Sequence, residues 1–356
     1  MFRLNYRDFL MRKIQSKFQE VMHQKEKNQA ATIKVPNRRI WENTSFERTV
    51  KMKEKPTMTT IGVSSVSCRR MVLMLHILTK IYKLIETNTY KTKRELYYED
   101  VTLFKKQAIV DNILDDISCM LNEPKINLHV LTTSKGCIAG NLRYKDGDGN
   151  YIDCNETSQG ILLPCDIKSI SYMQSDARFI LLVEKSAVFQ MLLDSNVTQL
   201  LHPCIMITGK GFPDVNTREM VKRLWNTLQV PILALMDADP YGIEILSVYK
   251  FGSKAMSFDA QNLAVPEIKW LGLLPSDIQR LHLSPESVIS MTNGDIKKTN
   301  QLLKRQYMQC NLSWEKEVQT LLATKKKAEI EGLSKMGSTF LPRTYLINKI
   351  RNGGWI

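Results

Sequence analysis

Acidic residues follow two hydrophobic runs of this sequence, at the point where each run ends. Glu184 closes the run FILLVEK (179–185), and Asp237 and Asp239 close PILALMDADPYG (231–242). A short run of Ile, Leu and Val that ends in charge is typical of a buried parallel strand, and ligands bind at the carboxyl ends of such strands. Carboxylates gathered there are hard oxygen ligands that suit Mg²⁺. These three residues are therefore predicted to hold Mg²⁺ for phosphoryl transfer.

The two runs differ in the residues that come after the acid. Glu184 is followed by the amphipathic segment SAVFQMLLDS (186–195), which predicts a strand, an acid and then a helix. Asp239 has a simpler alternative interpretation, because an aspartate before Pro240 and Gly242 is also typical of a turn or a helix cap.

A further strand is predicted between these two runs along the chain. The segment CIMI (204–207) leads into TGKGFPD (208–214), and NTREMVKRLWNTL (216–228) has helical periodicity with Asn216 as the expected N-cap. Strands and helices therefore alternate, which predicts a mostly parallel sheet. Lys210, in this loop, has two possible roles: it contacts a phosphate at this strand end, or it is an ordinary solvated loop residue. The loop is too short for an ATP-binding P-loop.

The region before this sheet has a different pattern. It predicts two long helices, a short helix between them, a strand and a β-hairpin, in the segments CRRMVLMLHILTKIYKLIE (68–86), TKRELYYED (92–100), QAIVDNILDDISCML (107–121), LHVLTTS (128–134) and the turn KDGDGN (145–150). Three helices followed by a hairpin is the order of a winged-helix, CAP-like DNA-binding domain.

The short helix carries two adjacent tyrosines in a basic setting. Tyr98 lies four residues after Arg94, so the two share a helix face, and this favours Tyr98 over Tyr97 as the exposed hydroxyl. Neighbouring cations are expected to hold a phosphate and to lower the pKa of a tyrosine hydroxyl, which is ordinarily a poor nucleophile. Those cations are Lys91, Lys93, Arg94, Lys105 and Lys106. The alternative is that both tyrosines pack and have no covalent role.

Composition narrows the class of partner. The chain has 356 residues, 43% of them hydrophobic, and a net charge of +14, which favours a two-domain globular protein with an acidic partner such as nucleic acid. Within residues 1–60 there are 14 Lys and Arg against 6 Asp and Glu. This segment is predicted to be a basic arm outside any core, with a possible partner-binding helix, or simply a solvated tail. The cysteines of the whole chain form no CxxC pair, so we expect an intracellular protein with reduced thiols. No apolar run in the sequence is long enough to span a membrane, so we expect no membrane association.

Taken together, these motifs resemble a known family. FILLVEK with the DADPYG acids resembles the Toprim metal site, and RELYYED resembles the catalytic tyrosine motif of the topoisomerase VI A subunit. The resemblance runs from about Arg69 to the C-terminal GGWI, through SKGCIAGNLRY, CIMITGKGFPDVNTRE and KWLGLLPSD. It is nearest to the eukaryotic meiotic members, which make the DNA double-strand breaks that initiate recombination.

The resemblance implies roles for residues at matching positions. Tyr98 would attack a DNA phosphodiester to give a 5′-phosphotyrosyl bond, and Arg94 would position the scissile phosphate. Glu184, Asp237 and Asp239 would hold Mg²⁺. The candidate DNA-contacting cations are Arg69, Arg70, Lys93 and Lys210.

The resemblance also implies an organisation. It predicts a winged-helix domain at residues 61–172, after the arm of residues 1–60, and a Toprim domain with a mostly parallel sheet and a C-terminal helical region at residues 173–356. It further implies a homodimer with composite active sites, a topoisomerase VI B-like subunit, meiotic accessory proteins, and a location on chromosomes in the nucleus.

Two alternatives keep part of this prediction. A Toprim nuclease or primase would use the same acids with water or a nucleotide hydroxyl as the nucleophile and would not need Tyr98. A catalytically silent winged-helix protein would need neither the tyrosine nor the acids.

Overall fold

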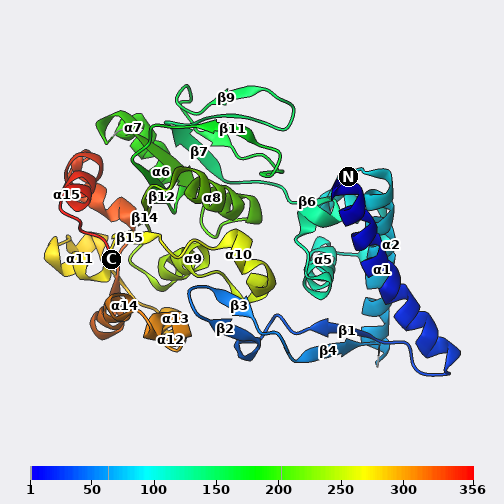
Figure 1. Ribbon diagram of the computed structural model, residues 1–356. Helices are drawn as coiled ribbons and strands as arrows, with labels where there is room; N and C mark the ends of the chain where they lie inside the picture. The colour runs from blue at the N-terminus through cyan, green and yellow to red at the C-terminus, as the bar shows by residue number, and fades with distance from the viewer. Residues whose placement is uncertain (1, 63, 202) are drawn as a thin grey trace. The chain divides into compact units, whose positions relative to one another are not determined.

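The computed structural model describes residues 2–62, 64–201 and 203–356 (Figure 1). These residues form two compact units. The first comprises Met1–Ser45, Val50–Thr133 and Lys254–Ala260, and the second comprises Phe46–Thr49, Ser134–Ser253 and Gln261–Ile356.

The first unit is built around long helices whose apolar faces share one core. Its elements are α1 (Phe2–Glu26), β1 (Ile33–Pro36), η1 (Trp41–Asn43), β2 (Thr44–Phe46), β3 (Val50–Met52), β4 (Met58–Ile61), α2 (Ser65–Thr87), β5 (Lys91–Thr92), α3 (Lys93–Glu99), α4 (Val101–Phe104), α5 (Gln107–Leu121), η2 (Lys125–Leu128) and β6 (Val130–Leu131). Helix α2 begins at a capping box between Ser64 and Ser67 and ends at Asn88, which adopts the left-handed conformation. The three predicted helices are therefore present.

The N-terminal segment does not lie outside the core, as its composition had suggested. Leu10 and Ile14 of α1 are buried and pack in the same cluster as Ile77 of α2, and β1 pairs antiparallel with β4. Some basic residues of α1, such as Arg12 and Lys25, are exposed, whereas Lys13 pairs with Glu123 of the same unit. The net charge of this segment gave no information about its apolar residues, and it is the burial of these residues that holds the helix in the core.

The second unit contains a six-stranded sheet in the order β10-β7-β13-β12-β14-β15. Strands β13 (Cys204–Thr208), β12 (Phe179–Val183), β14 (Ile232–Leu235) and β15 (Lys269–Gly272) are parallel to one another. Strand β7 (Cys137–Gly140) pairs antiparallel with β13, and β10 (Ile161–Leu162) pairs antiparallel with β7. The predicted, mostly parallel sheet is confirmed. The central strands are buried along their whole length, which is why they read as continuous apolar runs.

Helices connect the parallel strands. They include α6 (Ser186–Asp194), α7 (Val197–Leu200), α8 (Val215–Leu228) and α9 (Pro240–Lys250). The predicted N-cap of α8 was wrong: Asp214, not Asn216, caps the helix by accepting from the amide of Thr217 at 2.7 Å. Asn216 lies inside the first turn and is buried.

The hairpin predicted as the wing is present but groups with the second unit. Strands β8 (Arg143–Lys145) and β9 (Tyr151–Asp153) pair antiparallel and form a three-stranded sheet with β11 (Ser171–Gln174). The boundary between the two compact units therefore falls after residue 133, whereas the sequence predicted a boundary after residue 172. A winged-helix domain that includes this hairpin remains a prediction.

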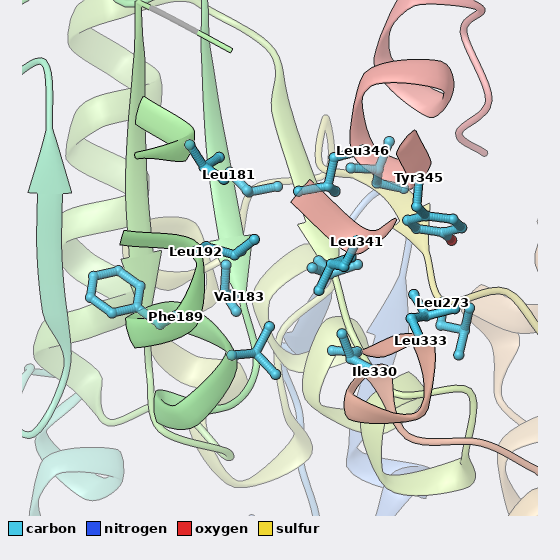
Figure 2. Packing of buried hydrophobic residues seen from close by; sticks show 14 of the residues in the cluster. Leu181, Val183, Phe189, Leu192, Leu273, Ile330, Leu333, Leu341, Tyr345 and Leu346 are labelled. Carbon is cyan, nitrogen blue, oxygen red and sulfur yellow. The ribbon is translucent and has the colours of Figure 1, made fainter. Parts of the chain in front are cut away.

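The C-terminal segment completes the core of the second unit. Figure 2 shows Leu333, Leu341 and Leu346 packed in the same cluster as Leu181 and Val183 of β12. The remaining elements of this unit are α10 (Ala260–Leu263, whose first residue groups with the first unit), α11 (Pro275–Arg280), η4 (Pro285–Ser287), β16 (Ile289–Ser290), α12 (Asn293–Leu303), α13 (Gln306–Gln309), α14 (Leu312–Thr324), β17 (Lys326–Lys327), η5 (Ile330–Met336), η6 (Phe340–Tyr345) and α15 (Leu346–Arg351), whereas η3 (Lys254–Asp259) belongs to the first unit. Residues far from the sheet in sequence therefore support its strands.

Among the helices of the described residues, none combines the length and the apolar content that crossing a bilayer requires.

Candidate functional site

Strand order brings two of the predicted acids together. Strands β12 and β14 are neighbours, with Val183 opposite Leu235, so Glu184 and Asp237 follow adjacent strand ends. Oε2 of Glu184 accepts a hydrogen bond of 2.9 Å from the backbone amide of Asp237. Both residues are buried, Glu184 being 7% and Asp237 3% exposed. The carboxylate of one strand end is thus held against the backbone of the next.

Asp239 lies at the start of α9. Its Oδ1 accepts from the backbone amides of Tyr241 at 2.9 Å and Gly242 at 2.7 Å. The helix-cap interpretation of this aspartate is therefore correct. Capping also fixes the direction of the side chain beside the DAD loop, because Pro240 starts the helix immediately after it.

Burial raises the pKa of all three carboxyl groups. The pKa of Glu184 is raised to about 8, mainly by burial and then by the charge of Asp237. Burial also raises the pKa of Asp237 to about 6 and raises the pKa of Asp239. Carboxylates that are buried near one another need positive charge to remain ionised.

The donor set fits a hard divalent cation in its chemistry, since it consists of carboxylate oxygens at a helix start and a strand end. The side chains do not converge on one point, however. Across residues 2–62, 64–201 and 203–356, no group of three or more His, Cys, Asp or Glu side chains is arranged to hold a metal ion. Oxygens of each acid are instead engaged by protein donors.

Residues from the C-terminal part of the chain complete this cluster, and the sequence patterns did not reveal them. Oδ1 of Asp237 accepts from the backbone amide of Ile330 at 2.8 Å, and Oδ2 lies 2.9 Å from Nζ of Lys185. Lys185 also contacts Glu329 and Glu331. The two glutamates lie more than 140 positions from Lys185, so only the fold brings them close.

The loop that carries Lys210 adjoins the same strand end. The backbone amide of Gly211 donates to the carbonyl oxygen of Glu184 at 2.9 Å, and Thr208 Oγ1 donates to the same oxygen at 3.3 Å. Lys210 is exposed, and its carbonyl oxygen accepts from Nζ of Lys135 at 3.2 Å. Two exposed lysines therefore lie beside the acidic cluster, of which Lys135 was not predicted.

In the first unit, α3 presents the predicted tyrosine to solvent. Tyr98 is 66% exposed, whereas Tyr97 is partly buried and packs against the helical core. Arg94, on the same helix face as Tyr98, is also exposed. The capping box between Thr92 and Glu95 fixes the start of this short helix, as predicted.

The basic residues around α3 are partly paired with acids. Lys93 lies 3.1 Å from Asp111, and Lys91 and Lys80 both bond Glu99. The positive setting expected from the sequence is thus reduced by acids that face it.

The two predicted DNA-contacting arginines at the start of α2 differ. Arg69 is exposed and donates to the carbonyl oxygen of Leu103 at 3.0 Å. Arg70 bonds the buried carboxylate of Asp116, which Arg38 also contacts at 3.0 Å. Arg70 therefore has a structural partner, and contact with DNA remains a prediction for both arginines.

Comparison with known proteins gives the class to which this fold and these residues belong. Residues 179–350 match the family model of the topoisomerase 6 A-subunit/Spo11 Toprim domain, and residues 69–130 match the model "Type IIB DNA topoisomerase". The first match contains the three acids and the segment of Lys185 and Ile330. The second contains Tyr98.

Individual relatives narrow the class further. The chain is 47% identical to "Meiotic recombination protein SPO11" of Mus musculus over 96% of this chain and 87% of the relative, with the same identity and coverage for the Homo sapiens protein. It is 40% identical to the A subunit of DNA topoisomerase 6 from Arabidopsis thaliana over 86% of this chain and 71% of the relative. The chain therefore belongs to the topoisomerase 6 A-subunit/Spo11 family, and it acts as a topoisomerase-like transesterase that forms DNA double-strand breaks in meiosis.

The coverage also corrects one expectation about the resemblance. With 96% of the chain aligned to the mouse protein, most of residues 1–60 lie within the matched region. The similarity extends well before Arg69, in agreement with the packing of α1 into the core.

Proposed function

We propose that Tyr98 is the nucleophile of the cleavage reaction. Its hydroxyl attacks a DNA phosphorus atom and forms the phosphotyrosyl P–O bond, while the bond from phosphorus to the 3′ oxygen breaks. The tyrosine loses its proton, and the departing 3′ oxygen takes one up as a free hydroxyl. The observation that carries this proposal is the exposure of Tyr98 on the same helix face as Arg94.

Arg94 is proposed to hold the scissile phosphate, because an exposed guanidinium one helical turn from the hydroxyl offers paired donors to phosphate oxygens. Arg69, Arg70, Lys93 and Lys210 are proposed to contact the DNA backbone, with Arg69 and Lys210 the better placed because both are exposed. Residues 61–172, which include α2, α3, α5 and the hairpin of β8 and β9, are proposed to form the winged-helix domain of the enzyme.

Glu184, Asp237 and Asp239 are proposed to hold Mg²⁺, which when bound would stabilise charge on the phosphate and the departing oxygen. The raised pKa values of these buried acids support a cation as their partner. Glu184 and Asp237 are held in place by the backbone of the DAD loop and of Ile330.

We further propose that two copies of the chain act together, so that each tyrosine works with the acids of the partner copy and two strands are cut. Meiotic accessory proteins and a topoisomerase VI B-like subunit are proposed as partners, with meiotic chromosomes in the nucleus as the location. The names of the relatives support a meiotic role and a partner subunit, since they describe meiotic recombination and the A subunit of a topoisomerase.

The test compares Tyr98→Phe with Tyr97→Phe in DNA recovered from meiotic cells or from a reconstituted reaction. After denaturation, 5′ ends should carry covalently attached protein with Tyr97→Phe and none with Tyr98→Phe. Cleavage that persists without attached protein in Tyr98→Phe would instead support a Toprim nuclease, and attachment lost only in Tyr97→Phe would reassign the nucleophile.

A further inference from the structure

Lys185 directly follows Glu184, and its ammonium group contacts three carboxylates. Nζ lies 2.9 Å from Oδ2 of Asp237, 2.9 Å from Oε2 of Glu329 and 3.0 Å from Oε2 of Glu331. An ammonium has three donors, so these contacts use its whole bonding capacity. The lysine therefore joins a predicted cation ligand to an acidic pair from the C-terminal segment.

The partners of Lys185 differ in burial. The side chain of Asp237 is 4% exposed, while those of Glu329 and Glu331 are 52% and 41% exposed. Withdrawing the ammonium from Asp237 leaves a buried carboxylate without its counter-charge, which is costly unless another cation takes its place. Withdrawing the ammonium from the two glutamates costs less, because water already reaches their carboxylates.

Both oxygens of Asp237 are engaged, but the two donors are not equally movable. Oδ1 accepts from the backbone amide of Ile330, whose side chain is fully buried and whose segment is paired to the DAD loop through Ala238 and Ala328. Oδ2 is held by a flexible lysine side chain. A cation that reaches Asp237 can displace the lysine by side-chain rotation, whereas displacing Ile330 would require the backbone pairing to break.

We propose that Lys185 is an internal competitor for the divalent cation at Asp237, and that Glu329 and Glu331 retain the ammonium when the cation binds. The acidic pair therefore sets how strongly the site takes up its cation. This inference rests on the cation site under "Proposed function" and assigns three residues that have no role there.

Two variants should shift cation affinity in opposite directions. Lys185→Met keeps the alkyl chain and removes the competing charge, so Mn²⁺ and Mg²⁺ should bind at least about tenfold more tightly, because unit charges a few ångströms apart interact strongly in a partly buried site. Glu329→Gln with Glu331→Gln leaves Asp237 as the main partner of the ammonium, so the same cations should bind more weakly. A purely structural role for Lys185 would not produce this reversal.

The measurement is calorimetric titration of the full chain with Mn²⁺ and with Mg²⁺ in the absence of DNA, with cation-induced shifts in Tm as a second readout. Lys335→Met, which removes a cation from the exposed ion pair with Glu286, is the matched control and should leave cation binding unchanged. Asp237→Asn should abolish binding in every background.

The outcomes separate the two proposals. If neither the wild type nor any variant binds the cations, both the cation site and the competition are overturned. If the wild type binds, Asp237→Asn does not, and Lys185→Met binds with equal or lower affinity, the competition alone is overturned. Should Lys185→Met fail to fold, the double glutamine variant carries the test, because it changes exposed groups, and unchanged or tighter binding there refutes the proposal.

Discussion

Replacing Gly242 by Ala should damage the acidic cluster while leaving most of the fold intact. Gly242 lies in the first turn of α9, and a Cβ there would be 2.5 Å from the carbonyl oxygen of Asp237 and 3.0 Å from both its amide nitrogen and Oε2 of Glu184. Ordinary contact begins at 3.4 Å, so the closest pair is 0.9 Å too near. Two of these atoms belong to backbone, so the DAD loop and the start of α9 have to separate.

The cost to stability is expected to be small because two effects oppose each other. Forcing an extra methyl into packed surroundings costs about 1–3 kcal/mol. Alanine in place of glycine in a helix favours the folded state by up to about 1 kcal/mol. The net destabilisation is therefore about 0–3 kcal/mol, which is less than the total stability of a typical folded domain.

The cost to chemistry is expected to be much larger. A shift of about 1 Å in a group that positions a reacting centre can reduce the rate on the order of 100-fold. The assay is the yield of covalent protein–DNA complexes, together with Tm by circular dichroism. Gly294→Ala is the control, since it also lies in the first turn of a helix but its Cβ would meet only Thr292 Oγ1 at 3.6 Å. Equal complex yields from Gly242→Ala and Gly294→Ala would refute the reasoning.

Two further predictions concern stability. Ile14 of α1 is 0% exposed, so Ile14→Ala should lower the free energy of unfolding, measured with urea, by about 2–5 kcal/mol. Met22 of the same helix is 61% exposed, so Met22→Ala should change that free energy by less than about 0.5 kcal/mol. Equal effects of the two substitutions would mean that α1 is not part of the core. Burial, and then the charge of Lys269, lowers the pKa of buried Lys250 from 10.5 to about 8, so between these values the unfolded state binds more protons and stability should rise with pH. Unfolding curves across pH 8 to 10.5 should show this rise in the wild type and in Lys335→Met but a smaller one in Lys250→Met, and an unchanged slope in Lys250→Met would contradict the assignment.

The positions of the strands and of the strand-end acids were predictable from the sequence. The runs that end at Glu184 and Asp237 are buried on both faces of the sheet, so burial left a continuous apolar signal that stops at the first charge. The capping box at Thr92 and the relative exposure of Tyr98 and Tyr97 were also predictable, since helix geometry alone fixes which residues share a face with Arg94.

Two predictions from local patterns were wrong because tertiary packing determines the feature concerned: the location of the N-terminal segment and the N-cap of α8. The charge of residues 1–60 indicated a solvated arm, because net charge counts the charged residues of α1 and ignores buried apolar residues such as Leu10 and Ile14. The N-cap of α8 was placed two residues late, because Asn216 and Asp214 are both suitable caps and only the path of the chain selects between them.

The sequence by itself predicted the candidate residues: two carboxylates at strand ends with a third two residues further on, and, in another part of the chain, a tyrosine with an arginine one turn away. Each of these predictions came from a pattern a few residues long. Only the tertiary structure decided that β12 and β14 are neighbours and that Lys185 meets Glu329 and Glu331. Strand order and contacts between distant segments depend on how the whole core fills its space, and no short stretch of the chain carries that information.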